Sequence, residues 1–445
     1  MVLKAILLIF FLANAASVKT QALNIGDFGA NGDGKQVNTA IIQAVIDSAH
    51  RAGGGEIWIP SGTFLTGSLR LYSNLSIRLS PGAILKGSPN LRDYNALHPH
   101  LLYALDAVNI HISGNGIIDG NGEAFYRLGD EVWTEGHRPL PWIKFEGCRF
   151  LSFRGVRLIN SPAHVLVLEG CSDVVIDGIR IENDFRSPNT DGIDINDSRD
   201  IFIANCFIST GDDAICLKSR QDTVKHIIVQ NCIIESDDAA IKTGTSTYKG
   251  VQDCLFTDLQ IRRTRYGIAL FMFDGGLHKN LVFSNIQMDM QSRHKTEYPI
   301  FIDIHRRSAD SRLGGQQNIV FRNIDIRTRG NILVAGQEGY PLRELVFENI
   351  RMEIGQEADL SQAGSRKPSG NKKFPLFPEL VDLHREAAHF TLGYATDVRL
   401  HNIQIIKRGE TRRSDFFVTN SSGIKVSDTP WDNSRVMNAE VILPR

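Results

Sequence analysis

Three aspartates, Asp191, Asp212 and Asp213, have the residue type and spacing that chemistry could use. They lie in Ser187-Pro-Asn-Thr-Asp-Gly192 and Ser209-Thr-Gly-Asp-Asp-Ala214, at separations of 212 − 191 = 21 and 213 − 191 = 22 residues. Carboxyl groups held close together raise one another's pKa, so one can stay protonated as a general acid while others activate a water. In a chain that repeats every twenty-odd residues, this spacing would place the three side by side on adjacent turns.

The sequence does repeat with such a period. A strand-like run, a corner of one or two residues bearing Asn, Gly or Cys, and a second run recur roughly every 22–27 residues. Because no helix repeats with them, the period favours a parallel β-helix over a propeller or a sandwich. The asparagines at the later corners are then expected to stack as a ladder: Asn285, Asn323, Asn349 and Asn402.

One helix is predicted, over residues 38–51, ahead of the first repeat. Its apolar residues are spaced by four, at Val37, Ile41, Val45 and Ala49. At this place it would cap the exposed edge of the first coil. The predicted fold class is all-β: a single-domain parallel β-helix over residues 22–445 with an N-terminal capping helix.

The first residues predict export rather than a buried terminal helix. Lys4 precedes a short apolar run, and Ala13-Asn-Ala15 has the small residues of a cleavage site. We therefore interpret residues 1–21 as a signal peptide and expect a secreted or periplasmic protein. The run is shorter than the about 20 apolar residues of a membrane helix, so no membrane anchor is expected. The net charge of −1 excludes the basic surplus typical of nucleic-acid-binding proteins.

Six cysteines in an exported chain suggest disulfides, yet five of them follow the repeat. The intervals between these five are 23, 35, 26 and 22 residues: Cys148, Cys171, Cys206, Cys232 and Cys254. We predict one column of small, buried, reduced side chains in successive coils. Disulfides between stacked neighbours, about 4.8 Å apart, are the alternative.

Aligning the coils by their strands places Asp191 beside Asp213, with Asp212 on the other side of the same bend. Asp237 and Asp238 would lie one coil further on. A fold gains nothing from such a concentration of like charge, so the aspartates favour general acid–base catalysis. A calcium site, which carboxylate oxygens also suit, and simple turn residues are the alternatives.

At these residues the chain resembles the polygalacturonase family of glycoside hydrolases, family 28, within the pectin-lyase-like right-handed β-helices. Asn189-Thr-Asp191 and Gly211-Asp-Asp213 at this separation are specific to the family, and further matching motifs lie at 53–62, 82–87 and 160–162. The Gly-rich opening at 27–34 also matches but is shared more widely. The resemblance implies a right-handed β-helix and an inverting hydrolysis. Asp212 would be the general acid, and Asp191 and Asp213 would hold and deprotonate the attacking water. No cofactor and no metal are implied.

Two departures from the family concern the substrate. A Gly-His-Gly motif is expected on the next coil, but this chain has Glu235-Ser-Asp-Asp-Ala239, without a histidine. One coil later, Ala269 and Phe271 stand where the family has an arginine and a lysine that bind the substrate's carboxylate. With two cations lost and two carboxylates gained, a galacturonate would meet a field of the wrong sign. We therefore expect a neutral sugar there, or binding by other cations: Lys242, Arg262 to Arg265, or His305 to Arg307.

The sequence thus predicts a secreted inverting glycoside hydrolase acting on a pectic-type polysaccharide or its oligosaccharides, other than plain polygalacturonate. The predicted substrate-binding residues are Asn189, Asp237, Asp238 and Lys242. Loops at 121–142 and 356–380 would shape the groove, with a disordered surface insert as the alternative for residues 361–373, and we expect a monomer. The alternatives are a polysaccharide lyase on the same fold, which would need calcium and an arginine base, and a non-catalytic glycan-binding β-helix.

Overall fold

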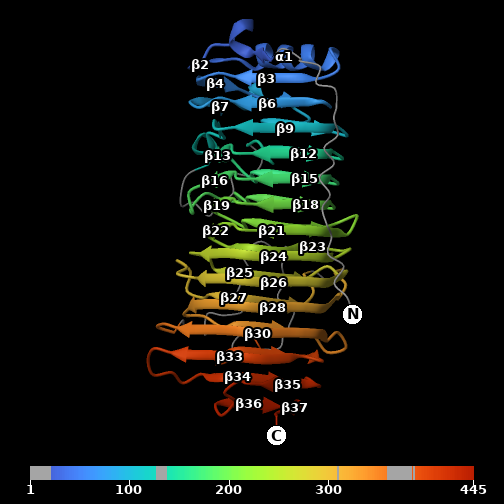
Figure 1. The fold of residues 1–445 in the computed structure, drawn as a ribbon, viewed down its shortest axis with the longest axis vertical. Coiled ribbons are helices and arrows are strands. Elements are labelled where there is room, and N and C mark those ends of the chain that lie inside the picture. The colour runs from blue at the N-terminus through green and yellow to red at the C-terminus, as the bar shows by residue number, and fades with distance from the viewer. Residues whose placement is uncertain (1–21, 127–137, 308–309, 358–382, 384–385, 445) are drawn as a thin grey trace.

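The computed structural model describes residues 22–126, 138–307, 310–357, 383 and 386–444. Parallel strands stack into a long β-helix that runs from the N-terminal helix to the C-terminus (Figure 1), which confirms the predicted fold class. The predicted signal peptide, residues 127–137 of the first predicted loop and nearly all of the second predicted loop lie outside the described residues. Within these ranges no helix is both long and apolar enough to cross a membrane.

Helix α1 (Thr39–Arg51) lies across the first coils at the N-terminal end (Figure 1), as the sequence predicts. Its buried face is Ile42, Val45, Ile46 and Ala49. Val37, which was expected on that face, is instead exposed and ends strand β2 (Asp33–Val37). A strict spacing of four drifts around a helix with 3.6 residues per turn, so the buried stripe instead follows the pattern i, i+3, i+4, i+7.

Within the described residues the strands form two sheets, of 24 and 13 strands, and the second carries the candidate site. Each of its neighbouring pairs is parallel, and one strand comes from each coil. In chain order its strands are β5 (Leu69–Arg70), β8 (Leu102–Leu105), β11 (Ile143–Glu146), β14 (Leu166–Glu169), β17 (Ile193–Asn196), β20 (Ile215–Ser219), β23 (Ala239–Thr247), β25 (Tyr266–Met272), β27 (Tyr298–Ile304), β29 (Ile332–Ala335), β31 (Ala388–Gly393), β34 (Ser414–Thr419) and β36 (Ser434–Met437). We call this the site sheet, and we call coils nearer the N-terminus upstream.

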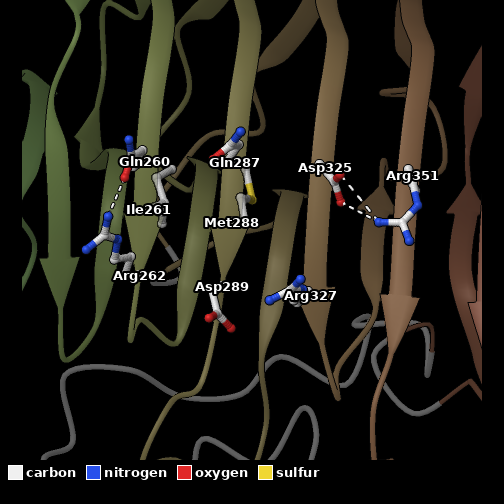
Figure 2. Close-up of a pocket in the computed structure, with 9 residues that line it drawn as sticks. All are labelled: Gln260, Ile261, Arg262, Gln287, Met288, Asp289, Asp325, Arg327 and Arg351. Carbon is white, nitrogen blue, oxygen red and sulfur yellow. Dashed lines mark hydrogen bonds and ion pairs between the residues drawn. The ribbon is translucent and has the colours of Figure 1, made fainter. Parts of the chain in front are cut away.

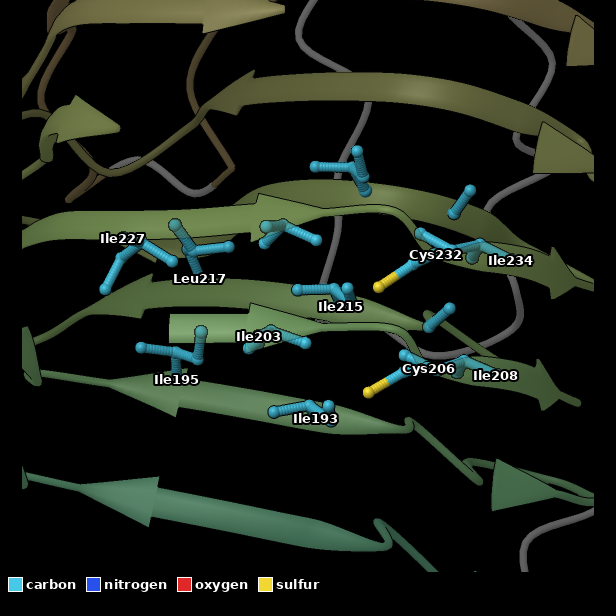
Figure 3. Close-up of a cluster of buried hydrophobic side chains, with 14 of the residues drawn as sticks. Ile193, Ile195, Ile203, Cys206, Ile208, Ile215, Leu217, Ile227, Cys232 and Ile234 are labelled. Carbon is cyan, nitrogen blue, oxygen red and sulfur yellow. The ribbon is translucent and has the colours of Figure 1, made fainter. Parts of the chain in front are cut away.

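Inward side chains of the site sheet repeat from coil to coil and hold the register. Ile193 pairs with Ile215, which pairs with Ile241, and Ile241 pairs with Ile268. All four are fully buried, and Figure 3 shows the first two coils of this stack with their neighbours. Slipping the register by one residue would turn this row outward and expose it, so burial fixes which residues become neighbours.

The predicted asparagine ladder is confirmed. The Nδ2 atoms of Asn323, Asn349 and Asn402 each donate to the Oδ1 of the asparagine one coil before, at 3.1, 3.0 and 3.0 Å. Asn285 begins the series and donates to Asp258 at 3.2 Å. All four asparagines have φ between 50° and 55°, in the left-handed region that asparagine tolerates better than most residues. The ladder therefore marks the corner where the long strands bend.

The prediction of a single cysteine column is wrong, although all six cysteines are buried free thiols. Cys148 lies beside Cys171, because the residues that follow them, Arg149 and Ser172, are paired. Cys206 lies beside Cys232 in a different column (Figure 3), because Phe207 pairs with Ile233. Cys254 lies in a third column beside Ile227. Every coil has several corners that accept a small buried side chain, so intervals near one period do not identify the corner.

Candidate active site

The register of the site sheet brings Asp191 and Asp213 together. They stand two residues before the paired Ile193 and Ile215, and the N–H of Gly192 donates to the carbonyl of Asp213 at 2.8 Å. Both aspartates are buried. The sequence predicted this adjacency.

The sequence suggested that Asp212 points to the opposite side of the bend, and this is wrong. One of its oxygens accepts the N–H of Asp213 at 2.9 Å, and the other accepts Nδ2 of Asn189 at 3.1 Å. One carboxylate oxygen from each of Asp212, Asp213 and Asp238 lies within 4.8 Å of the others. Because the Asp212 carboxylate accepts the N–H of Asp213, it is turned back over the bend. The carboxylates of Asp212 and Asp213 therefore face the same space.

The two sequence motifs are locked to each other by short-range contacts. The Thr190 hydroxyl accepts the N–H of Gly211 at 3.0 Å, and the Thr210 hydroxyl donates to the carbonyl of Asp212 at 2.6 Å. A Cβ at Gly211 would lie 2.1 Å from the carbonyl oxygen of Ser187, so only glycine allows this approach. The spacing of the motifs is thus a requirement of coil-to-coil packing around the aspartates.

Asp191 and Asp213 each contact a lysine that projects from the next coil. Lys218 Nζ lies 3.2 Å from Asp191 and 2.8 Å from Asp194. Lys242 Nζ lies 2.6 Å from Asp213 and 3.8 Å from Asp238. Among the described residues, no basic nitrogen lies within ion-pair distance, 4.0 Å, of Asp212. Its side-chain contacts are to neutral donors.

These surroundings act differently on the pKa values of Asp212 and Asp213. Loss of hydration raises the pKa of Asp212 well above its usual value, and the charges of Asp191 and Asp213 raise it further. Burial also raises the pKa of Asp213, but the Lys242 ammonium opposes this rise. The pKa of Lys242 is raised by Asp213 and Asp238 in spite of burial, so the ammonium remains charged. Asp212 is therefore the carboxyl group most strongly held in the protonated form.

The negative charge that the sequence showed at Asp237 and Asp238 is compensated by four cationic side chains, of which Lys242 and Arg265 were named from the sequence and Arg293 and His294 were not. Arg293 contacts both oxygens of Asp237, and His294 Nε2 lies 3.3 Å from it. Asp238 lies 3.6 Å from Arg265, in addition to its contact with Lys242. Both extra carboxylates are thus paired.

Ala269 and Phe271 face outward on the site sheet, one coil beyond Lys242. Both are buried in an apolar cluster with the aromatic rings of Tyr266, Tyr298 and Phe301. The Phe271 ring meets those of Tyr266 and Phe301 edge to face, with centroids 5.8 and 5.2 Å apart. The departure noted in the sequence is therefore a replacement of charge by a packed apolar surface.

Two groups of residues in the described structure have the donors and spacing of a cation site. They are His164 with Asp191 and Asp194, and Asp212 with Asp213 and Asp238. In each group a lysine ammonium of this chain already lies against carboxylate oxygens. Lys218 and Lys242 thus supply the positive charge that a calcium ion would otherwise provide.

Arg138 links the predicted upstream loop to the site. Its guanidinium donates to the carbonyls of Pro162 and Pro188 at 3.0 and 3.2 Å, and to Oδ1 of Asn189 at 3.1 Å. Asn189 in turn donates to Asp212. Asn189 was predicted to bind substrate, and both ends of its amide are engaged with the protein. Trp133 and His137 of the same loop lie outside the described residues.

Most of the other cations proposed from the sequence have partners away from the three aspartates. His305 lies 2.7 Å from Asp303, and Arg307 lies 2.9 Å from Asp274. Arg262 lines a polar groove of about 330 Å³ (Figure 2). That groove is formed by β24 (Val251–Arg262), β26 (Leu277–Asp289), β28 (Gly315–Thr328) and β30 (Leu342–Ile354). These strands belong to the 24-stranded sheet, so the groove is separate from the candidate site.

Several contacting residues were not singled out from the sequence: Arg138 as a site residue, His164, Asp194, Lys218, Arg293 and His294. Asp194 and Lys218 could have been found, since each follows a catalytic-motif aspartate on the same strand, by three and five residues. Arg293 and His294 carry no such signal. They lie between β26 and β27, in a loop held by Glu297, which accepts from Arg329 Nε at 3.0 Å and the N–H of Ser292 at 2.9 Å.

Comparison with known proteins agrees with the resemblance seen in the sequence. The family model "Glycosyl hydrolases family 28" matches residues 52–367. A probable polygalacturonase of Vitis vinifera is 26% identical over 286 residues, which are 58% of this chain and 58% of that protein. An exo-poly-alpha-D-galacturonosidase of Dickeya chrysanthemi is 28% identical over 338 residues, 60% of this chain and 55% of that protein. The matches thus span between half and two thirds of these curated relatives.

Solved structures show the same fold. The family 28 exopolygalacturonase of Yersinia enterocolitica has a TM-score of 0.70 at 21% identity, covering 95% of this chain and 78% of that one. An exopolygalacturonase of Thermotoga maritima has a TM-score of 0.64 at 22% identity, covering 76% of this chain and 88% of that one. At these identities the likeness concerns the β-helix alone.

Proposed function

The chain belongs to glycosyl hydrolase family 28, and from this premise we propose that it is a secreted hydrolase that cleaves glycosidic bonds in a pectic-type glycan with inversion. One observation supports the assignment of roles most directly. Asp191 and Asp213 each contact a lysine ammonium, whereas among described residues Asp212 contacts only neutral donors. An acid that must arrive protonated and bases that must arrive ionised need these different surroundings.

In the proposed reaction, Asp212 donates its proton to the glycosidic oxygen as the bond to the anomeric carbon breaks. Asp191 and Asp213 accept hydrogen bonds from a water, and one of them removes its proton as the water attacks the opposite face of the sugar. Oδ1 of Asp213 is buried and has no hydrogen-bond partner among the described residues, so it can accept from that water. The products are two shorter glycans, with an inverted anomeric centre and Asp212 ionised, before proton exchange restores the starting state.

Stereochemistry needs its own measurement. Inverting glycosidases hold their carboxyl groups about 6.5–9.5 Å apart, and retaining ones about 5–5.5 Å. Oxygens of Asp212 and Asp213 lie within 4.8 Å of each other, which is closer to the retaining range. Inversion is proposed from the family resemblance and from the third carboxylate, Asp191. Proton NMR of the first product formed should show the inverted anomer, and the retained anomer would reject this part of the proposal.

For the substrate, we propose a pectic glycan with a neutral or weakly charged sugar at the coil of Ala269 and Phe271. Both side chains are buried, and neither supplies the positive charge that would bind a carboxylate. The paired state of Asp237 and Asp238 removes the repulsion argument, so the proposal depends on this absence of positive charge at Ala269 and Phe271 alone. Comparing plain polygalacturonate with rhamnogalacturonan by release of reducing ends tests it, and faster cleavage of polygalacturonate would contradict it.

Substitution of the general acid is the primary test of the function. Asp212→Asn should lower kcat by about 10²- to 10⁴-fold, since general acid catalysis contributes on this scale, with the fold retained by circular dichroism. A variant with undiminished activity would reject the assignment. The matched control is Asp222→Asn, an exposed aspartate on the turn after β20, which should keep full activity.

The same assays separate the other functions. A lyase would release products that absorb in the ultraviolet and would stop on chelation of calcium, and a binding module would release no reducing ends. We further propose, from the sequence, that residues 1–21 are removed on export and that the protein acts as a monomer. Mass spectrometry of the protein exported by its host, and its sedimentation, test these two points.

A further inference from the structure

Four charged side chains form a closed ring on the upstream side of the trio. Asp194 Oδ2 lies 2.7 Å from His164 Nδ1, and Asp194 Oδ1 lies 2.8 Å from Lys218 Nζ. The same two cationic side chains reach Asp191 from the other end: His164 Nε2 lies 3.7 Å from Oδ1, and Lys218 Nζ lies 3.2 Å from Oδ2. Each oxygen of Asp194 therefore holds one of the two side chains, His164 and Lys218, that also contact Asp191.

The ring alternates in charge. Burial opposes ionisation of Asp194, but Lys218 and His164 outweigh it and lower its pKa overall. Burial likewise opposes the charged form of His164, and Asp191 and Asp194 raise its pKa above the usual value. The pKa of Lys218 is also raised, against burial, by Asp194. Two anions and two cations thus compensate one another out of contact with most of the solvent.

The fold does not require an aspartate at this position. Asp194 pairs with Val167 in the coil before it and with Cys216 in the coil after it, and both are buried. An apolar side chain therefore fits this column of the site sheet. Replacing buried ion pairs by apolar groups is often neutral or stabilising, so stability alone gives no reason to keep the charge.

We infer that Asp194 is a positioning residue, which fixes His164 and Lys218 so that they hold the Asp191 carboxyl group in its orientation toward the attacking water. This inference rests on the proposed function, in which Asp191 is a base. Asp194 itself contacts no reacting atom in the proposed reaction. Its influence passes through the two cations, and neither of them was part of the family motifs found in the sequence.

The test is Asp194→Asn, which keeps the shape but loses the charge. Because Asp191 acts on water and not on the bound sugar, the loss should fall on kcat. We expect kcat to fall about 10- to 100-fold, with KM within about twofold. This is the loss typically caused by removing a residue that orients a metal ligand through a hydrogen bond, which is a similar positioning role. Asp177→Asn is the matched control: Asp177 is ion-paired with Arg154 at 2.8 Å on the other sheet, and its loss should leave kcat unchanged.

A second set of variants separates positioning from folding. Adding Asp194→Asn to a His164→Gln/Lys218→Met background should change kcat by less than about twofold, because the groups through which Asp194 acts are already gone. If Asp194 served only the fold, its substitution would leave kcat per folded molecule unchanged in both backgrounds; if it acted independently of the two cations, it would lower kcat by the same factor in both, and either result would overturn the inference. This comparison also holds if the single variant is less stable, since each kcat is measured on the folded fraction.

Asp212→Asn distinguishes failure of this inference from failure of the proposed function. An inactive Asp212→Asn enzyme beside a fully active Asp194→Asn enzyme would overturn only the role of Asp194. An active Asp212→Asn enzyme would overturn the proposed function itself.

Discussion

The two flanks of the aspartate trio are built differently. On the upstream flank, Asp191 belongs to a closed ring in which charges alternate, with His164 and Lys218 held by Asp194. On the downstream flank, charges form an open chain that ends in the packed rings of the apolar cluster. The open chain runs through Asp213, Lys242, Asp238 and Arg265.

The difference shows how one site can hold neighbouring carboxyl groups in opposite protonation states. Both flanks supply a lysine to one carboxylate, and Asp212 lies between them with neutral donors. Its raised pKa comes from lost hydration and from the charges of Asp191 and Asp213, so the bases themselves help to keep the acid protonated. The closed ring contacts both oxygens of Asp191, whereas Oδ1 of Asp213 has no hydrogen-bond partner in the part of the chain that the structure describes.

The largest effect expected in the downstream flank follows loss of its lysine. Lys242→Met leaves Asp213 buried without its cation, so its pKa, already raised to about 7, should rise further. Because the base must be ionised, activity should be lost as pH falls at a higher pH than in the wild type. We expect the acidic limb of the kcat/KM profile to move upward by about one pH unit or more, the scale on which an opposite charge at this distance acts. If the acidic limb did not move, Lys242 would not control the ionisation of the base.

A smaller effect is expected at the outer end of the same flank. Arg293 lies on the rim and pairs with Asp237, which does not belong to the trio. Arg293→Met should raise the pKa of Asp237, now lowered in spite of burial by Arg293 and His294, and should change kcat less than about threefold, near the size of an exposed ion pair. Arg186→Met is the matched control, since Arg186 is as exposed and pairs with Asp184 at 2.8 Å. If Arg293→Met shifted the acidic limb of the kcat/KM profile as far as Lys242→Met, the residues of the downstream flank would act as one unit, as those of the ring do.

The sequence predicted the parts of the structure that follow from the period. The stacked Asn285, Asn323, Asn349 and Asn402, and the adjacency of Asp191 and Asp213, both depend on one coil lying on the next in a fixed register. Where the period left more than one corner open, as for the cysteines, the prediction failed. The period also says nothing about how a side chain turns, so it missed the folding back of Asp212.

The charge balance could be predicted only in part: Lys242 and Arg265 lie on or directly before aligned strands and were named from the sequence, whereas Arg293 and His294 lie in a loop. The strand sequence shows Asp237 and Asp238 as additional negative charge, but Arg293 reaches Asp237 from a loop 56 residues further along the chain. That loop is fixed by the buried Glu297 and by Arg329 from yet another coil. Contacts of this kind depend on three-dimensional loop packing, which leaves no regular trace in a repeat.

The central claim is that Asp212 is protonated when the substrate arrives, and carbon-13 NMR of aspartate carboxyl groups measures this directly. The difference between spectra of the wild type and Asp212→Asn isolates the Asp212 signal, which can then be followed against pH. We predict a carboxyl group that stays protonated well above the usual aspartate pKa of about 4, because hydration is lost and two carboxylates lie nearby. An Asp212 signal that titrates at or below that value would contradict the account.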